Sequence, residues 1–197
     1  MEEDLIRAYY STVSYLDALI GKLLKSLDDF GLRDNTTIVF WSDHGFFLGE
    51  HGFWCKHHTF QEAIHVPLLI SSPGKKKNAV SNALVEYVDI YPTICEIAGI
   101  DSPNYIHGKS MVPILENPNL RFKSEIYSRY QFREVVQDHD YSYHEILNYN
   151  KLKHATTNIF LTLTTIIVNF SLAFLIVLAC DFISSSEFGL MSFFNIS

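Results

Sequence analysis

The sequence has few cysteines, no excess of basic residues and no signal-peptide pattern at its amino terminus. Three cysteines in 197 residues give no disulfide framework, so cysteine usage leaves the redox compartment open. The formal net charge of −7 argues against a nucleic-acid-binding protein, which would usually present a basic face. The first residues, Met1–Asp4, are acidic and lack the basic and apolar regions of a secretory signal. Two interpretations follow: either the true start lies upstream, or the product stays in the cytosol.

The order of the predicted elements indicates an α/β fold. Apolar residues recur at helical spacing from Leu5 to Phe30, and Gly31 follows as a stop, which predicts an amphipathic helix. Residues 36–42 form a nearly all-apolar run, typical of a strand covered on both faces in a parallel sheet. A second strand is predicted over 66–71 and a short helix over 89–99. Helix, turn and buried strand in succession predict an α/β layer.

The polar residues after the first predicted strand have the chemistry of an ester hydrolase. Asp43 and His44 directly follow that strand, and in α/β sheets ligands collect beyond the carboxyl ends of the strands. A carboxylate and an imidazole are metal-ligand types, and the nearby Lys56 suits an anionic substrate. This combination is what a metal-assisted attack on a sulfate or phosphate ester needs.

Each of these residues also has a purely structural interpretation. Asp43 can cap the turn after the strand, His44 can be a hydrogen-bonding scaffold residue, and Lys56 can be a surface lysine. His57 and His58 look like a metal pair, but adjacent residues on a strand point in opposite directions. We therefore predict surface positions for both histidines.

Several short segments, in one order along the chain, resemble the sulfatase family. They are Tyr15-Leu16-Asp17, Ser42-Asp43-His44-Gly45, Leu48-Gly49-Glu50-His51-Gly52, Trp54, Lys56, His65-Val66-Pro67-Leu68, Val88-Asp89-Ile90-Tyr91-Pro92-Thr93, Ala98-Gly99, Gly108-Lys109-Ser110 and Ser128-Arg129-Tyr130. Within the family, the iduronate-2-sulfatase group is the nearest resemblance. The matched block corresponds to the C-terminal part of the catalytic domain. The resemblance implies a partial alkaline-phosphatase-like sandwich, with a mostly parallel sheet flanked by helices.

The resemblance also implies roles for individual residues. Asp43 and His44 would be metal ligands, most suitably for Ca²⁺, which prefers carboxylate oxygen. Lys56 would contact the sulfate group of the substrate, while Glu50 and His51 would order the loop behind these residues. The implied activity is hydrolysis of sulfate esters on sulfated glycosaminoglycans, and the implied location of the complete enzyme is the lysosome or the secretory pathway.

The nucleophile of the family is missing from this sequence. Sulfatases resemble one another in a formylglycine made from Cys in a Cys-x-Pro-x-Arg motif, and none of Cys55, Cys95 and Cys180 stands in that context. The early Asp-Asp metal pair of the family is missing as well. We therefore expect the chain to be a fragment of a sulfatase and inactive on its own, with an incomplete calcium site.

The last third of the sequence departs from the family pattern. We predict the sulfatase-like portion over 1–130, an irregular polar linker over 131–157, an apolar C-terminal helix over 158–182 and a tail over 183–197. Residues 159–180 carry no charge and are long enough to cross the apolar core of a bilayer, about 30 Å. Two interpretations stand for this stretch: a membrane helix, or a translated non-coding or misjoined segment.

Two other functions stay open at the level of sequence. The chain can be a non-catalytic, membrane-anchored remnant of a sulfatase, or a phosphoryl-transfer relative of the same superfamily. The Gly-Glu-His-Gly segment at 49–52 and Lys56 favour a sulfatase by resemblance alone.

Overall fold

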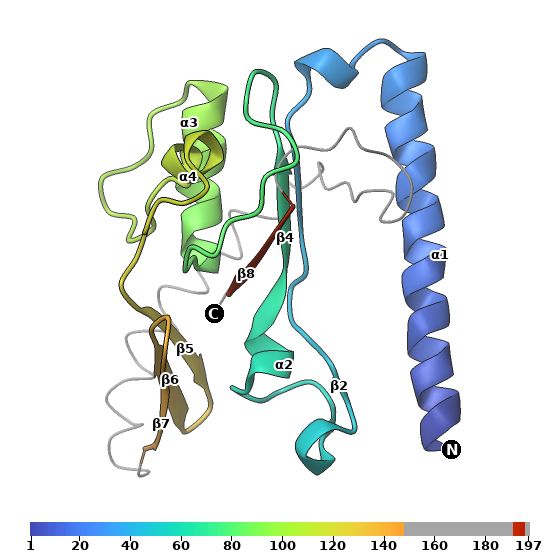
Figure 1. Ribbon diagram of the computed structural model, residues 1–197, viewed down its shortest axis with the longest axis vertical. Coiled ribbons are helices and arrows are strands. Elements are labelled where there is room, and N and C mark those ends of the chain that lie inside the picture. Colours follow the sequence, from blue (N-terminus) through green and yellow to red (C-terminus); the bar gives the residue numbers. More distant parts are fainter. Residues whose placement is uncertain (148–190, 196–197) are drawn as a thin grey trace.

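A computed structural model describes residues 1–147 and 191–195 of the chain (Figure 1). Its α-helices are α1 (Glu2–Asp29), α2 (Gln61–Ile64), α3 (Ile90–Ala98) and α4 (Val112–Glu116). Its strands are β1 (Ile38–Trp41), β2 (Phe47–Leu48), β3 (Trp54–Cys55), β4 (His65–Ser71), β5 (Ile126–Tyr130), β6 (Arg133–Gln137), β7 (Ser142–Ile146) and β8 (Met191–Asn195). Short 3-10 turns cover Arg33–Asn35, Glu50–Gly52 and Tyr87–Asp89.

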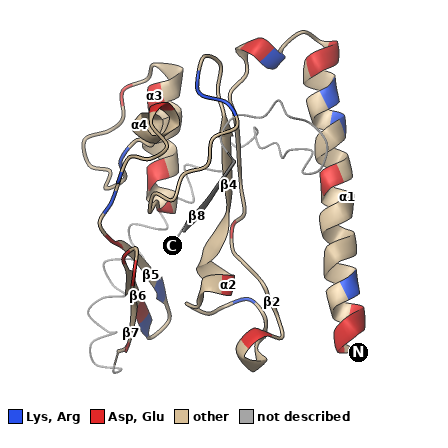
Figure 2. Ribbon diagram, in the orientation of Figure 1, with Lys and Arg blue, Asp and Glu red and all other residues tan. Residues whose placement is uncertain are grey.

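The predicted first helix is confirmed, and its sequence explains both ends. Acidic residues occupy the first turn of α1, where they complement the positive end of the helix dipole. At the other end Gly31 adopts a left-handed φ of 64°, and the N–H of Leu32 donates to the carbonyl of Leu27. This bonding pattern closes the helix as a Schellman motif, which glycine favours because it has no Cβ. Figure 2 shows acidic residues at both ends of α1.

The predicted strands are found, but the prediction of a mostly parallel sheet is wrong. The main sheet has the order β1-β4-β8, and both pairings are antiparallel. In the first, Ile38 faces Ser71 and Trp41 faces Leu68. An all-apolar strand indicates burial on both faces, and it carries no information about the direction of its neighbour.

Helices cover the two faces of this sheet. Alternate residues of β1 point to opposite sides, so Ile38 packs with Ile20 and Leu24 of α1, whereas Val39 joins the larger core. That larger core lies between the sheet and the helices α3 and α4. Its buried members are Val39, Val66, Leu68, Ile70, Ala79, Ala83, Val85, Ile90, Met111, Ile114 and Leu115. Figure 1 shows α1 on one side of the sheet, and α3 and α4 on the other.

A second three-stranded sheet, called the small sheet below, follows at the end of the sulfatase-like portion. Strands β5, β6 and β7 pair antiparallel in sequence order, and a left-handed Gln131 turns the chain between β5 and β6. Residues 133–137 and 142–146 are therefore strands, where an irregular linker was expected over 131–157. The sequence signal was weak because only Val135 is buried in β6 and no residue is buried in β7.

The predicted C-terminal helix at 158–182, including the apolar stretch 159–180, lies outside the described residues. Of the predicted tail at 183–197, only the backbone of β8 is described. Within residues 1–147 and 191–195, no helix has both the length and the apolar character needed to span a membrane.

Candidate active site

The turn after β1 places Asp43 and His44 at the carboxyl end of that strand, as predicted. The hydroxyl of Ser42 donates to the carbonyl of His44 at 2.8 Å, and the N–H of Gly45 donates to Ala63 at 2.8 Å. Tyr87 packs against the larger core, and its hydroxyl donates to the carbonyl of Ser42 at 2.7 Å. These bonds hold the turn against both α2 and the segment before α3.

Only glycine fits at position 45. A Cβ there would lie 1.9 Å from the carbonyl oxygen of Glu62 and 3.0 Å from the Cα of Ala63. Both of these are backbone atoms, so neither can rotate away. The close approach of the two backbones explains why a glycine follows Asp43 and His44 in the sequence.

Asp43 and Lys56, which are 13 positions apart in the sequence, meet in the structure. The ammonium Nζ of Lys56 lies 3.3 Å from Oδ2 of Asp43, and 84% of the Asp43 side chain and 38% of the Lys56 side chain are exposed. The two-stranded ribbon of β2 and β3 makes this contact, because Lys56 directly follows β3. An exposed pair of this kind is weak, so an incoming anion can compete for the ammonium group.

The backbone around Lys56 is strained. Cys55 and His57, on either side of it, have φ of 70° and 78°, and His51 has φ of 55°. Non-glycine residues rarely occupy this left-handed region, and such strain clusters at functional sites. The strain therefore supports a functional role for the loop that presents Lys56.

His44 is held in one orientation by its own turn. Its Nδ1 lies 2.8 Å from the carbonyl oxygen of Gly45. A carbonyl only accepts hydrogen bonds, so Nδ1 carries a proton, and the tautomer of the neutral ring that fits this bond has a free lone pair on Nε2. A neutral imidazole with a free Nε2 is a suitable metal ligand.

Glu50 and His51, in the loop between β2 and β3, each make a hydrogen bond. Glu50 bonds to the start of this loop, and His51 bonds to Glu62 in α2. Oε2 of Glu50 accepts the N–H of Leu48 at 2.6 Å, and this hydrogen bond lowers the pKa of Glu50 below its usual value. Nε2 of His51 lies 3.1 Å from Oε1 of Glu62. Neither residue contacts Asp43 or Lys56 in these bonds, and their role in ordering the loop stays a prediction.

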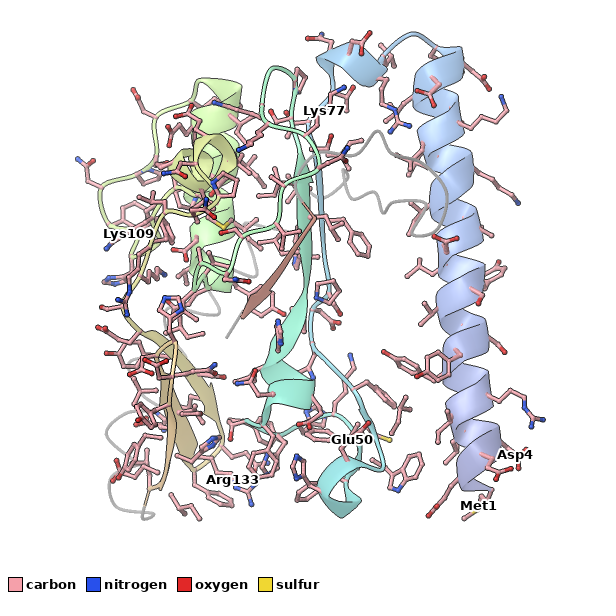
Figure 3. All side chains as sticks on the ribbon, in the orientation of Figure 1. Met1, Asp4, Glu50, Lys77, Lys109 and Arg133 are labelled. Atoms are coloured by element: carbon pink, nitrogen blue, oxygen red, sulfur yellow. The ribbon has the colours of Figure 1, made fainter. Side chains whose placement is uncertain are left out.

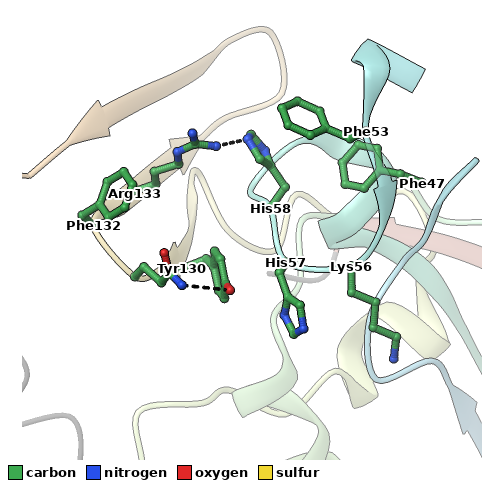
Figure 4. A pocket seen from close by; sticks show the side chains of 9 residues that line it. Phe47, Phe53, Lys56, His57, His58, Tyr130, Phe132 and Arg133 are labelled. Carbon is green, nitrogen blue, oxygen red and sulfur yellow. Dashed lines mark hydrogen bonds between the residues drawn. The ribbon is translucent and has the colours of Figure 1, made fainter. Parts of the chain in front are cut away.

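A cleft of about 210 Å³ lies beside Lys56, between residues 47–58, which include β2 and β3, and the small sheet (Figure 4). The residues that line it are Phe47, Phe53, Lys56, His57, His58, Tyr130, Gln131, Phe132 and Arg133. The prediction of a surface position for His58 is wrong, because His58 is only 8% exposed. Its neighbour His57 stacks on the ring of Tyr130 with centroids 5.3 Å apart. The alternation argument failed because residues 56–60 belong to a loop and not to a strand.

Sequence reasoning did not identify the contribution of the small sheet to this cleft. Arg133 begins β6 and donates through Nη1 to Nε2 of His58, which is 75 positions earlier. No local pattern in the sequence connects the two residues. Figure 3 places Arg133 and Glu50 toward the same end of the molecule, and Lys77 toward the opposite end.

The donor set fits a calcium ion only in part. The exposed carboxylate of Asp43 is a suitable ligand, but it faces the cation Lys56, and Ca²⁺ takes six to eight oxygen ligands. No cluster of three or more His, Cys, Asp or Glu side chains suited to a metal ion occurs in the part of the chain that the structure describes. The described residues therefore do not make up a calcium site by themselves.

Comparison with known proteins identifies a family. The model of the family described as Sulfatase matches residues 2–100, which is half of the chain. The N-acetylglucosamine-6-O-sulfatase of Bacteroides thetaiotaomicron is 43% identical over 113 residues, covering 57% of this chain and 20% of that protein. Human iduronate 2-sulfatase is 32% identical over 157 residues, covering 67% of this chain and 28% of that protein. The chain thus spans only 20% to 28% of the length of these two relatives.

Solved structures confirm the predicted α/β architecture. One is a protein in complex with its substrate, D-glucosamine-2-N,6-O-disulfate, with a TM-score of 0.59 and 32% identity over 73% of this chain and 33% of that chain. Another is the phosphonate monoester hydrolase of Agrobacterium radiobacter, with a TM-score of 0.65 and 25% identity over 70% of this chain and 32% of that chain.

Proposed function

Because this chain belongs to the sulfatase family, we propose that it supplies part of the active site of an enzyme that hydrolyses sulfate esters on sugars. The observation that carries the proposal is the contact of Asp43 with Lys56, which lies beside the cleft between two residues with left-handed φ. The relatives that act on N-acetylglucosamine 6-sulfate and iduronate 2-sulfate, by their names, support a sulfated sugar as the substrate class. The specific substrate that we propose is a sulfated glycosaminoglycan.

Lys56 would bind the sulfate group. Its ammonium is a compact charge with three donors, so it can contact sulfate oxygens and neutralise negative charge that develops when the ester bond breaks. The Asp43–Lys56 pair is open to solvent, and a sulfate ester can therefore reach Lys56 without displacing packed residues. Glu50 and His51 would keep the loop in place through their bonds to Leu48 and Glu62.

The proposed active site includes a metal ion. Asp43 and His44 would be two ligands of a calcium ion, and further ligands would come from outside the described residues. When bound, such an ion supplies polarisation of the ester. The nucleophile would also come from elsewhere, because none of the three cysteines lies in a Cys-x-Pro-x-Arg motif. The chain would therefore act as a fragment of a longer enzyme in the lysosome or the secretory pathway.

A hybrid enzyme tests this proposal. The segment of the Bacteroides N-acetylglucosamine-6-O-sulfatase that aligns with this chain would be replaced by the chain itself, and sulfate release from N-acetylglucosamine 6-sulfate would be measured. We expect release, and we expect Lys56→Ala to lower kcat/KM at least about 100-fold. Lys76→Ala is the matched control, because Lys76 lies in the exposed loop after β4 and should leave the rate unchanged.

A folded hybrid that releases no sulfate would overturn the proposal and favour a non-catalytic remnant. The likeness to a phosphonate monoester hydrolase supports a second candidate function, hydrolysis of phosphonate or phosphate monoesters. The same hybrid assayed with an aryl phosphonate separates the two activities, since a higher kcat/KM for the phosphonate would favour the second candidate.

A further inference from the structure

The cleft beside Lys56 has a charge opposite to that of the whole chain. The chain carries a formal net charge of −7, yet the lining of the cleft contains Lys56, Arg133 and two histidines, and no Asp or Glu. Low-dielectric aromatic walls from Phe47, Phe53, Tyr130 and Phe132 strengthen the field of the two cations, Lys56 and Arg133. The cleft is therefore suited to an anion.

Arg133 has donors to spare in this cleft. Its guanidinium carries five N–H donors and accepts nothing, and one donor reaches Nε2 of His58 (Figure 4). The guanidinium carbon lies 5.6 Å from the centre of the Phe132 ring. No carboxylate forms a salt bridge with Arg133 within the described portion of the chain, whereas the nearby Arg129 pairs with Glu134 at 3.2 Å. A planar guanidinium of this kind matches the two oxygens of a sulfate or carboxylate.

His58 provides a second, independent sign of a ligand. Because Arg133 can only donate, Nε2 of His58 is the acceptor, and the neutral ring then carries its proton on Nδ1. This Nδ1 is buried and has no acceptor among residues 1–147 and 191–195. Burial, followed by the charge of Arg133, lowers the pKa of His58 and keeps the ring neutral. A buried donor without an acceptor is costly, and an anionic oxygen would satisfy it.

We infer that this cleft binds a second anionic group, a sulfate or carboxylate, on the same sugar whose sulfate ester contacts Lys56, with Arg133 as its main contact. The inference rests on the proposed function, because Lys56, which would bind the sulfate ester, also lines the cleft. Arg133 lies outside residues 2–100, which match the family model. The site thus distinguishes sugars that carry one acidic group from sugars that carry two.

Calorimetric titration of the full chain with two sugars tests the inference. The probes are glucosamine 6-O-sulfate and D-glucosamine-2-N,6-O-disulfate, which differ by one sulfate. We expect the disulfate to bind about tenfold more tightly at low salt, as one charge-assisted contact would give. Arg133→Gln should abolish this difference and leave the affinity for the monosulfate unchanged. Arg133→Lys should keep part of this preference for the disulfate. A preserved preference would show that the positive charge binds the second anionic group and that the side chain does more than support the fold.

The matched control is Arg129→Gln, which removes the same charge from the neighbouring strand β5 and should keep the tenfold preference. Equal affinity of the unmodified chain for both sugars, or an equal loss of affinity for both sugars in Arg133→Gln, would overturn the inference.

Lys56→Gln distinguishes a failure of this inference from a failure of the proposed function. This variant should weaken the binding of both sugars to the same extent. If Lys56→Gln changes neither affinity while the effect of Arg133 persists, the role proposed for Lys56 is wrong and the anion site stands. Absence of binding of either sugar would overturn both.

Discussion

The ammonium of Lys123 lies 2.6 Å from the carboxylate of Asp89, which is fully buried at the start of α3. The same ammonium contacts Glu86, and the carboxylate of Asp89 also accepts the N–H groups of Glu86 and Lys109. Glu86 in turn accepts the N–H of Tyr127 in β5. This network joins the large core to the small sheet that provides Arg133.

Breaking this network should destabilise the protein. Lys123→Met keeps the length of the side chain but leaves the buried carboxylate of Asp89 without its cation, and we expect a loss of about 3 kcal/mol in the free energy of unfolding. Urea denaturation followed by circular dichroism measures the change. Lys25→Met is the control, since the pair of Lys25 with Asp29 is exposed on α1 and its loss should lower the free energy of unfolding much less. Equal losses in the two variants would contradict the prediction.

The close backbone contact at Gly45 can be tested by adding one methyl group. Gly45→Ala places a Cβ against the carbonyl of Glu62, and we expect a loss of about 2 to 3 kcal/mol with displacement of the turn that carries Asp43. Gly21→Ala is the opposite case. Gly21 lies inside α1 with nothing within 4 Å of the added atom, so the change should stabilise the helix by about 1 kcal/mol. Thermal melts of both variants measure whether stability falls or rises. A Gly45→Ala variant as stable as the unmodified chain would show that the turn can move.

The lowered pKa of His58 makes stability depend on pH in a defined direction. The folded state binds a proton on His58 less readily than the unfolded chain, whose histidine titrates near pH 6.5. The contribution of His58 is therefore fully present above about pH 6.5 and is lost as the pH falls below it. The charged or titratable neighbours involved are Arg133, His144, His51 and Glu62.

His58→Gln, which can still accept a hydrogen bond from Arg133, should show a shallower fall in unfolding free energy between about pH 7.5 and 5.5 than the unmodified chain. Denaturation curves at steps of pH measure both slopes. His139→Gln, in an exposed turn, serves as the control and should keep the original slope. Identical slopes for His58→Gln and the unmodified chain would refute the assignment.

The exposed apolar residues of α1 should make the chain associate. Only Ile20 and Leu24 of this long helix are buried, while Val13, Leu16, Leu19 and Leu23 are 41–48% exposed. An apolar surface of this kind, beside the edge strand β1, favours self-association.

Light scattering after size-exclusion chromatography should show species larger than 22.6 kDa for the unmodified chain. The double substitution Leu16→Glu and Leu23→Glu should shift the population toward the monomer. Ser11→Glu with Ser14→Glu adds the same charge on α1 without removing apolar surface, and it should shift the population less. A monomeric unmodified chain would contradict this prediction.

Local features of the fold were predictable from the sequence because they depend on neighbouring residues. The helical spacing of α1, its stop at Gly31 and the left-handed end of α3 at Gly99 all follow from side-chain periodicity and from backbone preference. The turn of Asp43 and His44 after β1 follows in the same way. The resemblance added the family, which the comparison over residues 2–100 confirmed.

The sequence by itself therefore determined the helices α1 and α3, the strands β1 and β4, the family and the residue types available for chemistry. Only the tertiary structure decided the antiparallel direction of β1 and β4, the distance between Asp43 and Lys56, and the meeting of His58 with Arg133. These three features depend on the paths that long connecting segments take between distant elements. The free energy that selects such paths comes from packing and hydrogen bonds between residues far apart in the chain. A pattern of neighbouring residues contains no information on such contacts, so the cleft became visible only once the small sheet was in place.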